Sequence, residues 1–239
     1  MPGDPRSPTI CIRGARAAYI GPSFALAPHT NAVATVAIAL EIPFQFAVAG
    51  SIYETHWVTL IPPGVEHHLV AVGPMVFLYL DAAEDDYAQL AQTTLVNRHS
   101  ALVQHVVDEP PRLEGLFARL GVPPRPPPAP HIARALRILE TPPRDGIRLA
   151  EVAQVADLSA SRFRHAIREL TGLTFRRYRR WRRLAVVIRS LAQGQDLTSA
   201  AFSAGFSSSA HLSTSFKATF GLRPSDLIKA GTTYDVDGA

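Results

Sequence analysis

Cysteine and lysine are scarce in this sequence, and it has no long apolar run. The 239-residue chain contains a single cysteine, Cys11, so no disulfide can form within it, which fits a reducing compartment. Its longest apolar runs, such as 32–40, are far shorter than the roughly 20 residues that cross a bilayer. No charged-then-apolar segment opens the chain, so we expect no secretory signal. We therefore expect a cytoplasmic protein with no membrane contact.

Positive charge comes almost entirely from arginine and is concentrated in the second half of the chain. Only two lysines accompany 22 arginines. Residues 1–130 carry 7 basic and 11 acidic side chains, whereas residues 131–239 carry 17 and 9, and the net charge of the whole chain is +4. Genome base composition would explain arginine in place of lysine, but not its crowding into one half. We infer that only the second half contacts a polyanion.

Glycines and prolines divide the chain into two globular parts. Hydrophobic residues make up 47% and charged residues 18% of the sequence, which is typical of a folded protein. Short apolar runs between turn residues indicate a small β-sandwich or barrel over 10–81, followed by helices. Six prolines in the ten residues 121–130 indicate an extended linker. We expect a flexible tail at 1–9, a β-domain at 10–120, the linker at 121–130, an all-helical domain at 131–229 and a polar tail at 230–239.

The segment 149–172 has the pattern of a helix-turn-helix unit. Asp157-Leu158 forms the predicted turn, and Ser159 is a good N-cap for the next helix. Phe163 and Ile167 face inward at i and i+4. A polar face near a helix N-terminus suits phosphates and base edges. The predicted outward side chains are Ser161, Arg162, Arg164, His165 and Arg168.

A second unit follows at 197–221, with its turn at Gly205-Phe206. Its predicted outward side chains are Ser209, His211, Ser213, Thr214 and Lys217. A strongly basic helix over 175–194 joins the units and would hold two reading helices apart, as adjacent major grooves about 34 Å apart require. We expect its basic side chains to neutralise phosphates, the alternative being a merely solvated face. The residues concerned are Arg179, Arg180 and Arg183.

These segments resemble the DNA-binding domain of the AraC/XylS family of bacterial transcription regulators. The resemblance covers 131–229 and rests on LSASRFRHAIRELTGLTFRRYRRWRRL followed by GFSSSAHLSTSFKATFGLRPSDL. It implies DNA contacts at Ser161, Arg164 and His165 of the first unit and at Ser209, His211, Ser213 and Thr214 of the second. Ala210 stands where the family usually has serine, and Thr214 where it usually has arginine. We therefore expect the first unit to dominate sequence discrimination.

The resemblance also implies a cupin-like front domain that senses a small molecule and helps the protein to dimerise. The run IPPGVEHH at 61–68 resembles the second cupin motif, whereas only His29 remains of the first. Because a catalytic metal needs more ligands than these, we expect no metal, no cofactor and no catalytic residue.

Four aromatic or imidazole side chains of the front domain are candidate effector contacts. Adjacent strand residues point to opposite faces, so at most one of two neighbouring histidines faces inward. The alternatives are structural turn histidines and an ordinary tryptophan of the barrel core. The four candidates are His29, Trp57, His67 and His68.

The sequence thus predicts an α+β two-domain protein, with a cupin-like β-barrel and flanking helices before an all-α domain of two helix-turn-helix units joined by a long helix. We expect a sequence-specific transcription regulator and not an enzyme. Its expected partners are double-stranded DNA, a small-molecule effector, RNA polymerase and a second copy in a homodimer. Two alternatives remain: a cupin-type metal-dependent enzyme with an appended DNA-binding module, and an architectural DNA binder without an effector.

Overall fold

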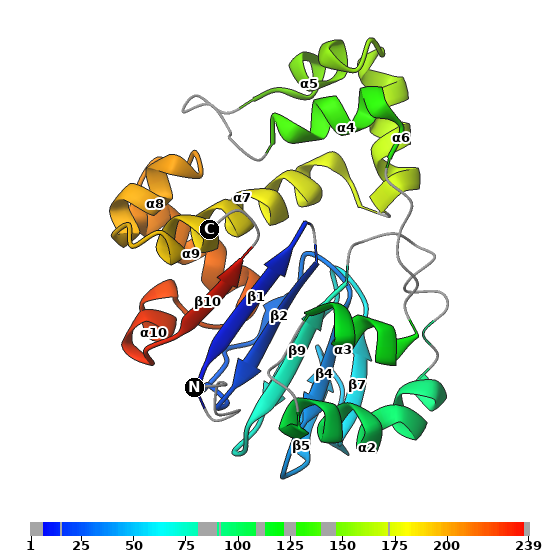
Figure 1. Ribbon diagram of the computed structural model, residues 1–239, viewed down its shortest axis with the longest axis vertical. Helices are drawn as coiled ribbons and strands as arrows, with labels where there is room; N and C mark the ends of the chain where they lie inside the picture. Colours follow the sequence, from blue (N-terminus) through cyan, green and yellow to red (C-terminus); the bar gives the residue numbers. More distant parts are fainter. Residues whose placement is uncertain are drawn as a thin grey trace.

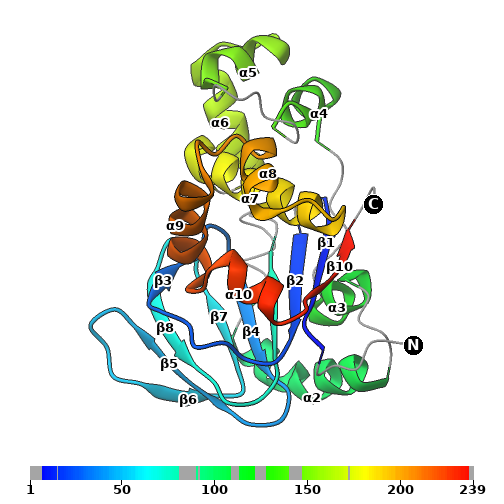
Figure 2. The ribbon, with the colours of Figure 1, turned by 90° about the vertical axis from the view of Figure 1, so that its left-hand side faces the viewer.

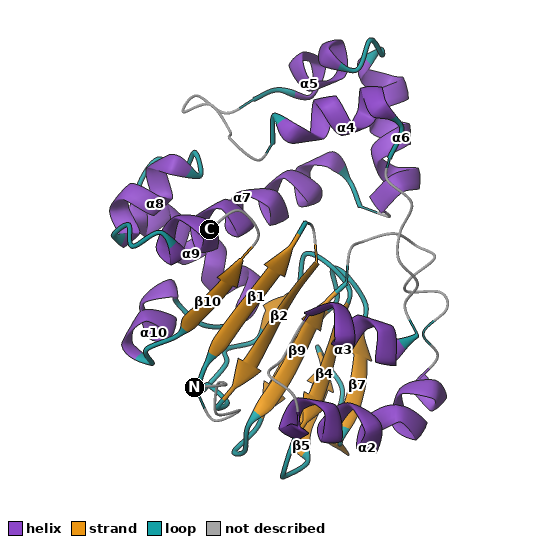
Figure 3. Cartoon of the chain, in the orientation of Figure 1, coloured by secondary structure: helices purple, strands orange, loops and turns teal. Residues whose placement is uncertain are grey.

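The computed structural model describes residues 7–14, 16–80, 90, 92–108, 113–121, 128–139, 147–171 and 173–236. A β-rich domain is followed by a helical domain, as the strands and helices of Figure 3 show. The predicted two-domain α+β fold is confirmed. Most of the predicted linker at 121–130 lies outside the described residues.

The first domain is built from two β-sheets. The six-stranded sheet has the order β10-β1-β2-β9-β4-β7, and the four-stranded sheet has the order β3-β8-β5-β6. The strands of the two sheets are β1 (Thr9–Arg13), β2 (Arg16–Gly21), β3 (His29–Thr30), β4 (Thr35–Ala39), β5 (Phe44–Val48), β6 (Glu54–His56), β7 (Val58–Ile61), β8 (Glu66–Val70), β9 (Met75–Tyr79) and β10 (Thr233–Val236).

Buried apolar side chains cover both faces of the six-stranded sheet. Phe44, Leu69 and Met75 belong to the core between the two sheets. On the opposite face, α2 (Gln92–Asp108) and the predicted helix α3 (Leu113–Leu120) pack their apolar sides against the strands (Figure 1). The first domain therefore has its own hydrophobic core.

The second domain consists of helices with well-defined ends. Thr174, Asp196 and Ser208 are N-caps whose side chains accept hydrogen bonds from backbone N–H groups of the first helical turn. Its helices are α4 (Pro130–Arg137), α5 (Leu149–Val155), α6 (Ala160–Thr171), α7 (Phe175–Ala192), α8 (Leu197–Ser203), α9 (Ser209–Phe220) and α10 (Pro224–Lys229).

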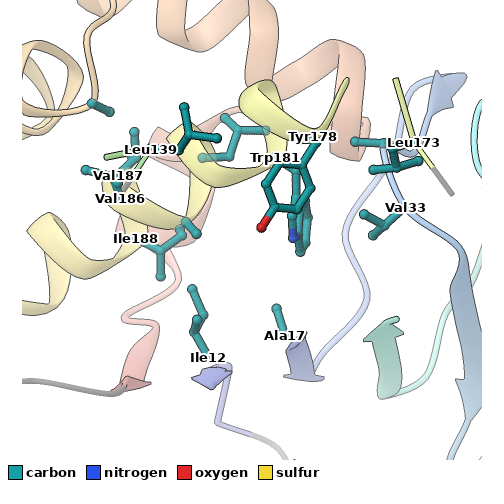
Figure 4. Packing of buried hydrophobic residues seen from close by; sticks show 14 of the residues in the cluster. Ile12, Ala17, Val33, Leu139, Leu173, Tyr178, Trp181, Val186, Val187 and Ile188 are labelled. Carbon is teal, nitrogen blue, oxygen red and sulfur yellow. The ribbon is translucent and has the colours of Figure 1, made fainter. Parts of the chain in front are cut away.

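A further hydrophobic cluster spans the two domains. Ile12 and Ala17 of the six-stranded sheet belong to the same buried cluster as Trp181 and Ile188 of α7, and Figure 4 shows these side chains between the strands and the helix. The buried guanidinium of Arg182 extends this contact, since Nη1 donates to the carbonyl of Gly14 (3.1 Å). The helical domain is therefore packed against the β-domain and not merely tethered to it.

The predicted polar tail at 230–239 is wrong for Thr233–Val236, which forms β10 and pairs in parallel with β1. β1 itself begins at Thr9, inside the tail predicted at 1–9. Arg13 strengthens the pairing through an ion pair with Asp235 (2.6 Å). Thr233, Tyr234 and Val236 are of types that favour strands, but so short a run needs a partner strand. The free edge of β1 supplies its backbone partners.

Candidate nucleic-acid interface and interdomain cavity

Both helix-turn-helix units are built on the same backbone turn. In the first unit Asp157 has a φ of +55°, and the N–H of Leu158 donates to the carbonyl five residues earlier (3.0 Å). In the second unit Gly205 has a φ of +74°, and the N–H of Phe206 makes the equivalent bond (2.9 Å). A left-handed residue followed by such a bond is a Schellman C-cap, so both predicted turns are confirmed.

The first reading helix, α6, buries one face and exposes the other. Ser159 caps it, since its Oγ accepts from the N–H of Arg162 (3.3 Å). Phe163 and Ile167 are completely buried, as their spacing predicts. His165 lies 3.1 Å from Glu169 one turn further along. The predicted DNA contacts on the exposed face are Ser161, Arg162, Arg164, His165 and Arg168.

The second reading helix, α9, also keeps a polar face exposed, although its other face packs on the β-domain. Phe216 and Phe220 point to that domain, and the helix contacts β3. His211 is oriented by a hydrogen bond to Ser207 (3.0 Å). Of the predicted DNA contacts, His211, Thr214 and Lys217 are exposed, while Ser209 and Ser213 are half-buried.

The arginines of α7 divide into exposed and internally bonded ones. Arg180 is exposed. Arg179 donates to the carbonyl of Ile147, just before α5. Arg183 donates to the carbonyls of Ala204 (2.8 Å) and Gly205, and its guanidinium lies 3.9 Å from the centroid of the Phe206 ring. Burial lowers the pKa of Arg183, and the neighbouring Arg179 and Arg180 add to this. Arg183 thus fastens the second turn to the connecting helix.

The two reading helices lie at opposite ends of α7 in Figure 1 and on the same side of the molecule, the left, in Figure 2. With 18 residues, α7 is about 27 Å long at a rise of 1.5 Å per residue. Successive major grooves on one face of B-DNA are about 34 Å apart. The connecting helix by itself therefore spans most of the distance between adjacent grooves.

A cavity lies between the domains, with about 80 Å³ accessible to a water molecule. The sheet side contributes Tyr19 and Phe77, and the helical domain contributes Trp181, Phe216 and Phe220. The rings of Trp181 and Phe220 both lie 5.5 Å from that of Tyr79 on β9. A molecule in this cavity touches the β-domain, the connecting helix α7 and the reading helix α9 at once.

Two histidines and an asparagine give the cavity a polar end. His29 on β3 is directly opposite His67 on β8, with the ring centroids 4.3 Å apart, and Asn31 follows β3. Burial, and then the nearby His67, lowers the pKa of His29 to about 4. Burial also lowers the pKa of His67. Both imidazoles are therefore neutral at physiological pH.

The four predicted effector contacts do not lie together. His29 and His67 line the interdomain cavity. His68, on the opposite face of β8, contacts Tyr53 and the carbonyl of Leu26 (2.9 Å) instead. Trp57 is 45% exposed and lines a separate surface pocket. The centroid of its ring lies 5.3 Å from that of His99. The expectation that at most one of His67 and His68 faces inward agrees with this placement.

A protein-family model described as a helix-turn-helix domain matches residues 152–230. These residues hold both turns, both reading helices and the basic connecting helix. Residues 152–230 are an AraC-type helix-turn-helix domain. No curated protein sequence matches the chain.

Solved structures of ToxT from Vibrio cholerae resemble most of the chain, the AraC-type domain included. A 1.65 Å structure of ToxT is 11% identical, with a TM-score of 0.54, and the match covers 90% of this chain and 97% of that one. An apo variant of ToxT is 13% identical, with a TM-score of 0.55 and coverages of 91% and 98%. ToxT bound to an unsaturated fatty acid is 13% identical, with a TM-score of 0.51 and coverages of 85% and 89%. At these identities the likeness establishes the fold: a cupin-like β-rich domain followed by the AraC-type domain.

Among the described residues, no three or more histidine, cysteine or acidic side chains gather as metal ligands would. None of the helices in this part of the chain is both long and apolar enough to span a bilayer.

Sequence reasoning missed the helical half of the cavity wall. Trp181 and Phe220 have the periodicity of residues in the core of the AraC-type domain, and nothing in that pattern shows that they also meet Tyr79. The large aromatic side chains on α7 and α9 are the signal that could have pointed to this contact.

Proposed function

We propose that this protein is a sequence-specific transcription regulator whose affinity for DNA is controlled by a small, largely apolar effector. The AraC-type domain places α6 and α9 in adjacent major grooves, and the effector occupies the interdomain cavity. The observation that carries the proposal is the composition of the cavity wall, which combines strands of the β-domain with α7 and α9. The same helices present the exposed reading faces.

Arg164 and His165 of α6 are assigned to base edges, because they are exposed on the outward face of the first reading helix. Arg180 is assigned to phosphate, since it lies exposed on the connecting helix and outside the two reading helices. Arg183 is assigned an internal role, because its guanidinium is already bonded to two carbonyls.

The apolar wall of the cavity supports the class of effector. Aromatic and aliphatic side chains dominate it, with few polar groups, as in most small-molecule sites. ToxT has been solved with an unsaturated fatty acid and with (E)-4-(8-methylnaphthalen-1-yl)but-3-enoic acid, both of them largely apolar molecules. Since this chain has the same fold, these complexes favour an apolar ligand here too.

A short chain of hydrogen bonds links the cavity to the second reading helix. His29, in the cavity wall, donates from Nδ1 to the carbonyl of Ala27 (2.9 Å). The N–H of Ala27 in turn donates to the carbonyl of Gly221, the C-cap of α9 (2.8 Å). An effector that shifts His29 or the aromatic wall therefore also shifts the end of α9. The protein with bound effector then has a different affinity for DNA from the protein without it.

The DNA-binding assignment is tested with two arginine variants on two duplexes. A duplex selected from a randomised library supplies the specific site, and a scrambled duplex of equal length supplies the non-specific one. Arg164→Ala should lose about 1–3 kcal/mol on the specific duplex and much less on the scrambled one. Arg180→Ala should weaken both alike and reduce the salt dependence of binding by about one counterion. Fluorescence anisotropy measures both, and an equal loss for Arg164→Ala on the two duplexes would refute base readout.

A further inference from the structure

The polar end of the interdomain cavity presents hydrogen-bond acceptors. Asn31 is 3% exposed, and its Nδ2 donates to Thr35 Oγ1 (2.8 Å). The hydroxyl of Thr35 donates onward to the carbonyl of Val33 (3.3 Å), which fixes the direction of the asparagine amide. Asn31 Oδ1 is buried without a hydrogen-bond partner. Such a buried carbonyl oxygen is costly unless something donates to it.

The two histidines at this end are oriented in the same way. His29 Nδ1 lies 2.9 Å from the carbonyl of Ala27, and His67 Nδ1 lies 2.9 Å from the carbonyl of Val65. A carbonyl oxygen only accepts, so in each neutral ring Nδ1 carries the proton and Nε2 carries the lone pair. Three residues with an acceptor atom, from β3, β8 and the position after β3, thus line the same apolar cavity.

The geometry points to a ligand with a neutral hydrogen-bond donor as its head group. We propose that the effector is an apolar molecule bearing a hydroxyl, such as an alcohol or a phenol, and that Asn31 Oδ1, the acceptor with no partner, receives its one O–H, with His29 Nε2 and His67 Nε2 as neighbouring acceptors. This inference rests on the proposed function and adds the chemistry of the head group to it.

A carboxylate does not suit this end of the cavity. It has only acceptor oxygens at neutral pH, and these would face the lone pairs of three acceptors. Arg16 is the cation of the cavity wall, but its guanidinium lies 4.8 Å from the ring centroid of Phe117 on α3. Protonating His29 to pair with a carboxylate would cost about a thousandfold in affinity at pH 7, because its pKa is about 4.

Tyr79 is a wall residue that could serve either head group. Burial, and then the nearby Tyr19, raises the pKa of the Tyr79 hydroxyl, so it stays protonated and can donate or accept. A single neutral donor does not offset the desolvation of a carboxylate. The choice between head groups therefore depends on the three acceptors.

Three probes of the same shape test the proposal on the full-length protein: 4-phenylbutan-1-ol, 4-phenylbutanoate and butylbenzene. Isothermal titration calorimetry at pH 7.5 measures their affinities. We expect the alcohol to bind about tenfold or more tightly than the carboxylate, and several-fold more tightly than butylbenzene. Asn31→Leu should bring the alcohol close to the affinity of butylbenzene, since it removes the acceptor that has no partner in the protein. His67→Phe should reduce the advantage of the alcohol by less, and both substitutions keep an apolar side chain of similar size.

Ile188→Ala, which trims the apolar wall on α7, is the matched control and should weaken all three probes alike. Circular dichroism checks that each variant is folded, and Asn31→Ala replaces Asn31→Leu if the latter is not.

The outcomes separate the head-group inference from the proposed function. If the carboxylate binds as tightly as the alcohol, or if Asn31→Leu and His67→Phe leave their ratio unchanged, the head-group inference is wrong while the effector site stands. Stoichiometric binding of Zn²⁺ that is lost in His67→Phe would also overturn it, in favour of a metal. If none of the probes binds, or if binding leaves the DNA affinity unchanged, the effector role itself fails.

Discussion

Gly221→Ala tests whether the end of the second reading helix is docked on the β-domain. Gly221 has a φ of +76°, and an added Cβ would lie 2.6 Å from the carbonyl oxygen of Ala27 and 2.7 Å from His29 Nδ1. Real side chains do not approach so closely, and the first of these atoms is backbone that cannot swing away. Either the C-terminus of α9 or the segment at 27–29 must therefore move.

Gly194 supplies the matched control for the size of the effect. It has a φ of +80°, and an added Cβ meets no atom within 4 Å. Both alanine variants carry the cost of a left-handed residue, about 1–2 kcal/mol. Gly221→Ala adds an overpacking cost of about 1–3 kcal/mol. The free energy of unfolding should therefore fall by roughly 2 kcal/mol more for Gly221→Ala than for Gly194→Ala.

Urea unfolding of the full chain, followed by circular dichroism, gives both values from the shift in midpoint. The backbone strain is common to the two variants and cancels in their difference. Equal losses would refute the docking of Gly221 against Ala27 and His29. So would a larger loss for Gly194→Ala.

Two further predictions concern Arg183 and His29. Arg183→Ala removes two hydrogen bonds to carbonyls and the stack on Phe206, so thermal unfolding should show that the free energy of unfolding falls by about 2–3 kcal/mol. For the exposed Arg180→Ala, the control, it should fall by about 0.5 kcal/mol or less. Similar losses in the two variants would contradict the internal role of Arg183. The pKa of His29 falls from its ordinary 6.5 to about 4 on folding, so the unfolded chain binds more protons between these values. Stability should therefore decline as the pH is lowered from about 6.5 to about 4, by up to about 3 kcal/mol, and urea titrations of His29→Gln should show a flatter decline.

The hydrophobic cluster shared by the domains packs the proposed effector cavity and the two predicted reading helices into one unit. A ligand can shift an equilibrium only through contacts that differ between two states. Here the contacts of α7 and α9 with the sheet are also the wall of the cavity, so a ligand necessarily adds to or replaces them. The pairing of β10 with β1 holds the far end of the helical domain to the same sheet.

Local sequence patterns determined the reading helices. Phe163 and Ile167 at i and i+4 assign the buried face of α6 and so leave Arg164 on the outside. Ser159 and Gly205 mark turns whose hydrogen bonds close within a few residues. Helix periodicity and capping depend on neighbours in sequence, and this is why the fold class and the helix-turn-helix units could be read from the sequence.

Only the tertiary structure decided which polar side chains are used inside the protein. Arg183 and Arg180 look alike on a helical wheel, but the first meets two carbonyls 21 and 22 residues further along the chain and the second does not. Trp57 and His67 are both plausible cavity residues in the sequence, and the packing of the domains places only His67 there. The strand β10 likewise exists because β1, more than 220 residues away, offers it a free edge. Such contacts join residues far apart in sequence, so they depend on how the domains pack and leave no periodic trace in either segment.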